Sequence, residues 1–218
     1  MRNIEAVIFD MDGLMFDTER ISFRSWKEVC KKEGLTMEED FYTSLIGRNL
    51  KGFGVIMKET YGEDFPLDRL YEEKIKIMTD FMNKNGVPVK TGLHELLDYL
   101  KDQNYKVAVA TSTSRERALH MLEMAGVKNK VNYVICGDEV INSKPNPEIF
   151  LKAAEKLGVS PDKCIVLEDS GAGIEAAHAA GMKGINVPDM KVPDEEMKKR
   201  SFMICNSLLE VRDYLKNV

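Results

Sequence analysis

The sequence predicts an α/β protein in which a parallel sheet is covered by helices on both faces. Three observations support this fold class. Short apolar runs typical of buried strands alternate with segments of helical periodicity, an order that favours right-handed βαβ units. The runs are almost continuously apolar, as expected where both faces of a sheet are buried. Finally, the purely helical pattern of residues 17–85 predicts an all-helical cap, inserted after the first strand of a Rossmann-like core.

The first predicted strand, residues 6–9, is an apolar run that leads directly into Asp10, Asp12 and Gly13. In parallel sheets, ligands bind just beyond the carboxyl ends of the strands, so this position predicts that both acids lie at the mouth of a site. Two carboxylates this close together repel each other, and one would stay protonated unless a cation neutralised them. The pair therefore indicates a metal site, an acid/base role, or both.

The cap is predicted to contain four helices. The first has an apolar stripe and ends at Gly34, since glycine is favourable just past a helix. Residues 36–39 have the form of a capping box and predict the start of the second helix. Residues 47–52 form a polar turn bounded by glycines, and the third helix runs to about residue 61. Pro66 opens the fourth helix. Its apolar side comprises Leu67, Leu70, Tyr71, Met78, Phe81 and Met82.

Strands and helices alternate again after residue 86. The expected strands are residues 106–111, 133–136, 163–167, 183–187 and 202–205. Pro147 is expected at the first position of a helix, where its missing N–H costs nothing. The charged segment 190–200 is expected to be a surface excursion.

These patterns predict two parts. Residues 1–16 and 86–218 form the catalytic core, and residues 17–85 form the cap. The connections at residues 15–17 and 85–91 join the parts, and we expect them to act as hinges of a lid over the carboxyl ends of the strands.

Composition narrows the function classes. The 218 residues carry a formal net charge of −5, which argues against nucleic acid as the main partner. No apolar run approaches the roughly 20 residues of a membrane helix, so no membrane partner is expected. The N-terminus runs straight into the first strand and leaves no room for a signal peptide. The four cysteines lack zinc-like spacing and are expected to be buried and reduced, as in a cytoplasmic protein.

Polar residues follow the predicted strands at the edge where their carboxyl ends meet. They are Asp10, Asp12, Thr111, Lys144, Glu168 and Asp169. The acids make a hard-oxygen site that suits Mg²⁺, and the hydroxyl and ammonium suit a phosphoryl group. A metal-neutralised carboxylate can act as a nucleophile, while a neighbouring acid transfers protons. This set of residues therefore predicts chemistry at a phosphoryl group.

The same residues carry a family resemblance. Four segments resemble, in order, the motifs of the haloacid dehalogenase superfamily of phosphatases and phosphomutases. They are Asp10-Met11-Asp12-Gly13, Val109-Ala110-Thr111-Ser112, Ser143-Lys144-Pro145 and Leu167-Glu168-Asp169-Ser170. Residues 14–19, 23–26 and 171–174 resemble the branch typified by β-phosphoglucomutase, which has a four-helix cap.

The resemblance implies roles for these residues. Asp10 would be the nucleophile and Asp12 the acid/base. Mg²⁺ would be bound by Asp10, the backbone carbonyl of Asp12 and Asp169, with Glu168 close by through water. Thr111 and Lys144 would hold the phosphoryl group. Substrate contacts are expected at Ser112 and in the cap at Gly47 and Arg48.

One departure separates two outcomes within the family. The mutase has a cap histidine that assists transfer within the sugar, and the matching residue here is Ser22. An unassisted intermediate passes its phosphoryl group to water, so a phosphatase is favoured over a mutase that interconverts β-glucose 1-phosphate and glucose 6-phosphate. The expected substrate is a small phosphorylated metabolite, with a sugar phosphate as the favoured class.

Two other classes of protein fit less well. A signalling receiver domain also uses an acceptor aspartate, a hydroxyl and a lysine on a parallel sheet. Receivers are shorter, lack a helical insert and carry the acceptor on a middle strand, whereas Asp10 follows the first strand. An inactive relative that only binds phosphorylated ligands is disfavoured because both Asp10 and Asp12 are present.

Overall fold

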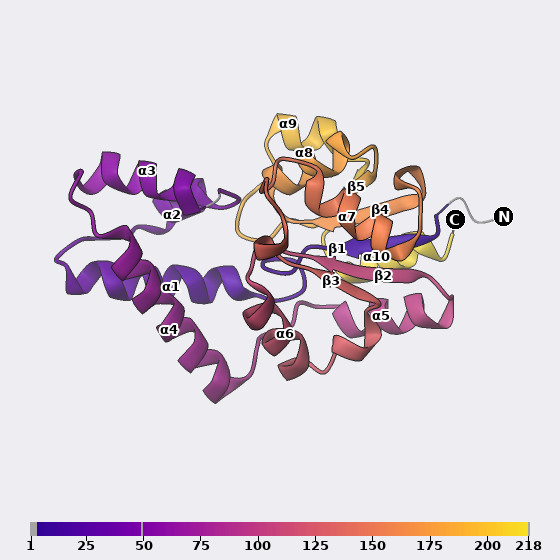
Figure 1. Ribbon diagram of the computed structural model, residues 1–218, viewed down its shortest axis with the longest axis horizontal. Coiled ribbons are helices and arrows are strands. Elements are labelled where there is room, and N and C mark those ends of the chain that lie inside the picture. The colour runs from indigo at the N-terminus through magenta and orange to yellow at the C-terminus, as the bar shows by residue number, and fades with distance from the viewer. Residues whose placement is uncertain (1–3, 49, 218) are drawn as a thin grey trace.

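The computed structural model describes residues 4–48 and 50–217. In this part of the chain the core is a six-stranded sheet with the order β3-β2-β1-β4-β5-β6, and every neighbouring pair is parallel. The strands are β1 (Ala6–Phe9), β2 (Lys106–Ala110), β3 (Tyr133–Ile135), β4 (Cys164–Glu168), β5 (Lys183–Asn186) and β6 (Met203–Ile204). The predicted α/β class with a parallel sheet is confirmed, and helices lie on both faces of the sheet (Figure 1).

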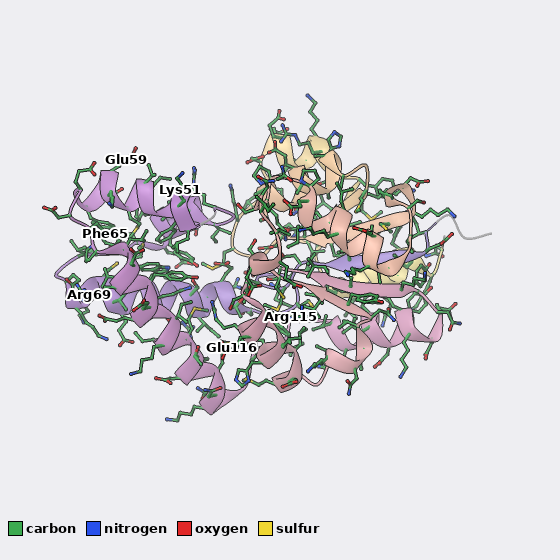
Figure 2. All side chains as sticks on the ribbon, viewed as in Figure 1. Lys51, Glu59, Phe65, Arg69, Arg115 and Glu116 are labelled. Carbon is green, nitrogen blue, oxygen red and sulfur yellow. The ribbon has the colours of Figure 1, made fainter. Side chains whose placement is uncertain are left out.

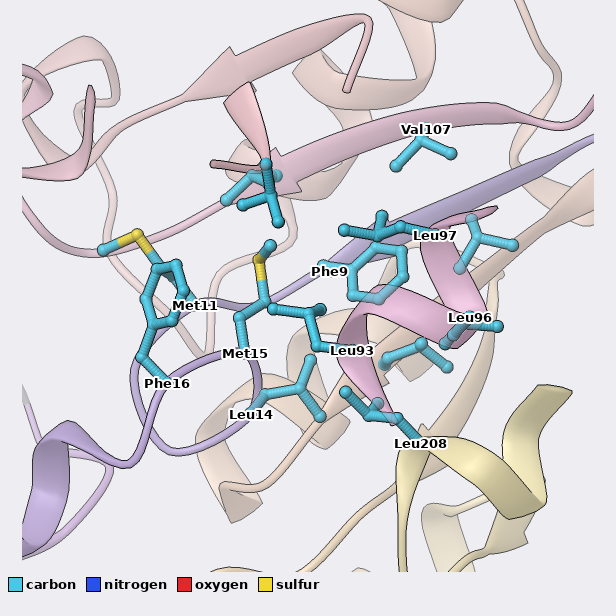
Figure 3. Packing of buried hydrophobic residues seen from close by; sticks show 14 of the residues in the cluster. Phe9, Met11, Leu14, Met15, Phe16, Leu93, Leu96, Leu97, Val107 and Leu208 are labelled. Carbon is cyan, nitrogen blue, oxygen red and sulfur yellow. The ribbon is translucent and has the colours of Figure 1, made fainter. Parts of the chain in front are cut away.

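The two faces of the sheet bury different side chains, because successive residues of a strand point to opposite sides. On one face Phe9 packs against Leu93, Leu96 and Leu97, within a large cluster of buried side chains (Figure 3). On the other face Ile8 lies in a second cluster that is rich in alanine. This placement explains why β1 reads as a continuous apolar run in the sequence.

Six helices surround the sheet in the described part of the chain. They are α5 (Leu93–Asp102), α6 (Arg115–Met124), α7 (Glu148–Leu157), α8 (Gly171–Ala179), α9 (Glu195–Arg200) and α10 (Leu208–Leu215). Pro147 precedes α7 as its N-cap residue and is not its first residue, which corrects the predicted position. None of the helices described is both long and apolar enough to cross a membrane.

Helix α9 lies within residues 190–200, the segment expected to be a charged surface excursion. Asp194 caps α9, since its Oδ1 accepts a hydrogen bond from the Met197 backbone N–H at 2.9 Å. Met197 is buried, while the other residues of α9 are charged. One buried side chain gives no readable periodicity, so the sequence pattern did not predict this helix.

Four helices form the cap and pack around their own hydrophobic cluster (Figures 1 and 2). They are α1 (Thr18–Lys32), α2 (Glu39–Leu45), α3 (Leu50–Tyr61) and α4 (Leu67–Asn85). In the cluster the rings of Trp26 and Phe53 stack with their centroids 4.8 Å apart. Asn49, within the predicted turn, lies outside the described residues.

Two details of the cap differ from the predictions. The capping box at Thr36 is wrong, because α2 begins at Glu39 with Glu38 as its N-cap residue. The segment before α2 instead carries Met37 into the cap cluster, where it is fully buried. Phe81 was expected on the apolar side of α4, but it is 40% exposed.

The two connections between cap and core lie side by side. Phe16 and Val89 form an isolated antiparallel bridge. The Asp17 N–H donates to the Pro88 carbonyl at 2.9 Å, and the Lys90 N–H donates to the Met15 carbonyl at 2.9 Å. Because the linkers pair with each other, we propose that the division between core and cap runs through them, as the sequence predicts.

Candidate active site

A cavity of about 730 Å³ lies between the cap and the carboxyl ends of the strands. Every site residue predicted from the sequence lines it: Asp10, Asp12, Gly47, Arg48, Thr111, Ser112, Lys144, Glu168 and Asp169. Topology explains this convergence, since β1, β2 and β4 are neighbours and run in the same direction. The roles of these residues stay predictions, but their common location is a property of the fold.

Lys144 forms the centre of a buried ion-pair network. Its Nζ donates to the Asp10 carboxylate, to Glu168 Oε1 at 2.7 Å and to the Ala110 carbonyl at 3.1 Å. Burial opposes the charge on Lys144, but the carboxylates of Asp10 and Glu168 raise its pKa above the ordinary value. Lys144 is therefore a fixed ammonium beside Asp10.

One lysine does not balance the acids around it. Burial raises the pKa of Asp10 from 3.8 to about 8, against the opposing effect of Lys144, and Glu168 contributes to the rise. Burial, together with Glu168 and Asp10, also raises the pKa of Asp169 well above its ordinary value. Three buried acids next to one ammonium leave an excess of negative charge, and a divalent cation would relieve it.

Two glycines leave room for the carboxylates of Asp169 and Glu168. Gly13 has a φ of 83°, and a Cβ there would lie 2.3 Å from Asp169 Oδ2. A Cβ on Gly173 would lie 1.8 Å from Glu168 Oε1. Both glycines therefore leave the space that these carboxylates occupy.

The four predicted metal ligands do not form a preassembled cage of side-chain oxygens. Among the described residues, the one group of three side-chain ligands within 4.8 Å of one another is Cys136, Asp138 and Glu139. That group directly follows the carboxyl end of β3, Asp138 lines the same cavity, and Arg115 pairs with Glu139 at 2.9 Å. The resemblance gives Asp12 a backbone oxygen as its metal ligand, and the metal-binding roles of Asp10, Asp12, Glu168 and Asp169 stay predictions.

Hydroxyl groups hold the side chain of Asp12. Thr18 Oγ1 donates to Asp12 Oδ1 at 2.7 Å, and Thr113 Oγ1 donates to Asp12 Oδ2 at 2.7 Å. Thr111 Oγ1 is a third donor at 3.4 Å. Asp12 is thus oriented by both the cap and the core, and no hydrogen bond in the described residues ties it to Lys144.

The sequence prediction missed Thr18 and Thr113 as site residues. Thr113 comes two residues after Thr111, within the same loop, so its position carried a usable signal. Thr18 begins α1 and belongs to the cap. The linker geometry that brings it to Asp12 has no local sequence pattern.

Thr113→Val tests the hydroxyl contact to Asp12 while the shape of the side chain is kept. We expect kcat to fall about 10- to 100-fold, because a hydrogen bond to a charged group contributes about 1.5–3 kcal/mol. Steady-state phosphate release measures this effect, with Thr113→Ser as the control that keeps the hydroxyl. Equal losses in the two variants would contradict the role assigned to the hydroxyl.

The cap contributes a polar cluster to the cavity. Tyr42 Oη donates to Glu19 Oε2 at 2.5 Å and lies 2.7 Å from Ser22 Oγ. Burial raises the pKa of Glu19. Burial also lowers the pKa of Lys74 from 10.5 to about 8, and Arg117 adds to this effect. Glu19, Tyr42 and Arg117 were not predicted, because the cavity gathers them from three separate helices.

The cap loop packs closely on the core. Gly47 has a φ of 86°, and a Cβ there would lie 3.3 Å from the Cβ of Ser170. Arg48 follows it and is exposed, yet it lines the cavity. Residues of the cap loop therefore border the same space as the strand ends.

Comparison with known proteins agrees with this geometry. Residues 7–187 match the family model of haloacid dehalogenase-like hydrolases. The chain belongs to this family and is a phosphatase-type hydrolase of its β-phosphoglucomutase-like branch, as the sequence motifs predicted.

The chain is also similar to individual proteins of this family. It is 35% identical over 186 residues to a phosphorylated carbohydrates phosphatase of Thermotoga maritima. The aligned region covers 84% of each chain. It is 31% identical over 184 residues to a fructose-1-phosphate phosphatase of Escherichia coli, covering 84% of this chain and 95% of the other. The crystal structure of β-phosphoglucomutase from Clostridium difficile superposes with a TM-score of 0.82 at 27% identity, covering 98% and 96% of the two chains.

Proposed function

We propose that the protein is a Mg²⁺-dependent phosphatase of a sugar phosphate and that it acts through an aspartyl-phosphate on Asp10. The observation that carries this proposal is the contrast between the two aspartates. Asp10 is buried against the Lys144 ammonium, whereas Asp12 is held by hydroxyl groups and has no lysine partner among residues 4–48 and 50–217. One carboxylate is placed for attack, and its neighbour is free to transfer a proton.

The excess of buried acids fits a divalent cation. Asp10, Asp169 and the backbone carbonyl of Asp12 would hold Mg²⁺, with Glu168 nearby, and all four residues line the same cavity. When bound, Mg²⁺ would neutralise the carboxylates and the phosphate oxygens. The proposed bond-making and proton-transfer steps would then be carried out by Asp10 and Asp12, whose side chains are held by hydrogen bonds in the cavity.

The proposed reaction has two steps. An Asp10 carboxylate oxygen forms a bond to phosphorus while the ester P–O bond breaks, and the leaving oxygen takes a proton from Asp12. Water then attacks the phosphorus while the bond between the Asp10 oxygen and phosphorus breaks, and the deprotonated Asp12 accepts a proton from that water. Phosphate leaves, and Asp10 and Asp12 return to their starting states. Thr111 and Lys144 would stabilise charge on the phosphoryl oxygens throughout.

Ser22 supports hydrolysis over the mutase alternative. Its hydroxyl lies in a hydrogen-bonded group with Tyr42 and Glu19, where an imidazole would be needed to assist a second transfer. The similarity to a β-phosphoglucomutase structure keeps the mutase as the second candidate. Hydroxyl and carboxyl groups in the cap cluster also suit recognition of a polyol, and two relatives are named as phosphatases of carbohydrate phosphates.

A substrate panel separates the two candidates. The purified protein is incubated with Mg²⁺ and a set of sugar phosphates that includes β-glucose 1-phosphate and fructose 1-phosphate. Release of inorganic phosphate supports the phosphatase. Accumulation of glucose 6-phosphate without phosphate release would establish the mutase instead. No turnover of any member would contradict both.

Lys74 predicts an alkaline limit to activity. A lysine with a pKa of about 8 is an ammonium below that pH and neutral above it. If its charge holds the substrate, kcat/KM falls about tenfold for each pH unit above the pKa. The measurement is kcat/KM between about pH 6 and 10, compared with Lys74→Arg, which stays charged throughout this range. An unchanged alkaline limb in Lys74→Arg would show that another group titrates.

A further inference from the structure

A carboxylate outside the catalytic cavity joins the core to both linkers. Asp189 lies on the loop after β5, and its side chain is 1% exposed. Its Oδ1 accepts a hydrogen bond from Arg20 Nη1 at 2.6 Å and from Lys90 Nζ at 2.7 Å. Arg20 belongs to the first turn of α1, and Lys90 belongs to the second linker. Three segments far apart in the sequence therefore meet at one oxygen.

The surrounding contacts strengthen this junction. Arg20 Nη1 also pairs with Asp17 Oδ1 at 2.6 Å, so the guanidinium bridges the first linker and the core loop. The backbones of the two linkers are hydrogen-bonded to each other beside it, through the Asp17 and Lys90 N–H groups. Met190, the next residue of the core loop, packs against the hydrophobic cluster of the cap. Rotation of the cap about its linkers would have to break the ion pairs of Asp189 or move the core loop together with the cap.

The position of Arg20 connects this junction to the side chain of Asp12 in the cavity. Thr18 and Glu19 precede Arg20 in the first turn of α1. Thr18 donates to Asp12, and Glu19 accepts from Tyr42. An ion pair that fixes Arg20 therefore also fixes the turn that carries both side chains into the cavity.

We propose that Asp189 is a positioning residue. It holds the paired linkers and the first turn of α1 so that Thr18 reaches Asp12 when the cap lies on the core. The contact between Thr18 and Asp12 matters to catalysis only under the proposed function, whereas the hold on the linkers does not depend on it. The two parts can therefore be tested separately.

The hold on the linkers is tested by amide hydrogen exchange. Asp189→Asn keeps the shape of the side chain and removes the charge. Arg20→Gln removes the Arg20–Asp189 ion pair by changing its exposed partner. It serves as the second variant if Asp189→Asn fails to fold. We expect the Asp17 and Lys90 amides to exchange at least about tenfold faster in both variants. The matched control is Asp213→Asn, since Asp213 on α10 also pairs with two cations, Arg212 and the C-cap residue Lys216. Unchanged exchange at both linker amides would overturn the proposal, whether or not the protein is a phosphatase.

The link to Asp12 is tested by a double-mutant cycle on kcat. If Asp189 acts through the first turn of α1, Asp189→Asn and Thr18→Val should each lower kcat about 10- to 100-fold, and the double variant should lose little more than the worse single variant. A merely structural role of Asp189 would give losses that multiply, and that result would overturn the positioning role. Failure of the wild-type protein to release phosphate would instead contradict the proposed function.

Discussion

Asp10→Asn is expected to abolish turnover while the fold stays intact. Asparagine matches aspartate in shape, and its carbonyl oxygen can still accept a hydrogen bond from Lys144, which normally donates to Asp10. It cannot supply the anionic oxygen that attacks phosphorus. We expect kcat to fall by at least about 10⁴-fold, as is typical when a nucleophile is removed.

The measurement is phosphate release under single-turnover conditions, with circular dichroism to confirm the fold. The matched control is Asp213→Asn, which changes an aspartate on the outer surface of α10 and should keep wild-type activity. Trapping of radiolabelled phosphate on the wild-type chain, and its absence from Asp10→Asn, would locate the covalent intermediate. Phosphate release that survives the substitution would remove Asp10 as the nucleophile.

Lys144→Met is expected to lower both stability and activity. Methionine has a similar length, but it leaves Asp10 and Glu168 buried together without the ammonium that pairs with both. Removing one partner from a buried ion pair costs about 3–5 kcal/mol, because the remaining charge has no compensation. Activity should fall as well, since Lys144 is the ammonium proposed to stabilise the phosphoryl oxygens.

Urea unfolding in Mg²⁺-free buffer at neutral pH measures the loss of stability. The control is Lys152→Met, because Lys152 pairs with Glu148 on α7 and is 39% exposed, so its removal should change the unfolding midpoint little. Restored stability of Lys144→Met on addition of Mg²⁺ would further support a cation site among the acids. A free energy of unfolding equal to that of the wild-type protein would contradict the role of Lys144 in balancing charge.

Much of the core of this site was predictable because several functional residues stand at the ends of apolar runs, whereas Lys144 lies in a loop and was picked out by its motif. Asp10, Thr111 and Glu168 mark strand ends, and parallel strands bring their ends to the same edge. The short-range signals were less reliable. Thr36 has the form of a helix cap, yet α2 begins at Glu39, and Met37 is buried in the cap cluster before the helix starts.

Apart from Gly47 and Arg48 of the cap loop, the cap residues that line the cavity were not predicted. Glu19, Tyr42 and Lys74 come from three helices, and their meeting depends on how the cap packs and how the linkers place it. Asp189 shows the same difficulty. It stands in a loop with no motif, and its partners, Arg20 and Lys90, lie about 169 and 99 residues away along the chain.

The separate hydrophobic cluster of the cap has a consequence for how such proteins diversify. Most buried side chains of the cap, such as Trp26 and Phe53, pack against one another within α1–α4, although Ile21, Met78 and Met82 join the core cluster, so many substitutions in the cap leave the core packing in place. The buried network around Lys144 belongs to the other part of the molecule and need not change with them. Selection for a new substrate can therefore act on the cap, while the buried network around Lys144 in the core stays the same.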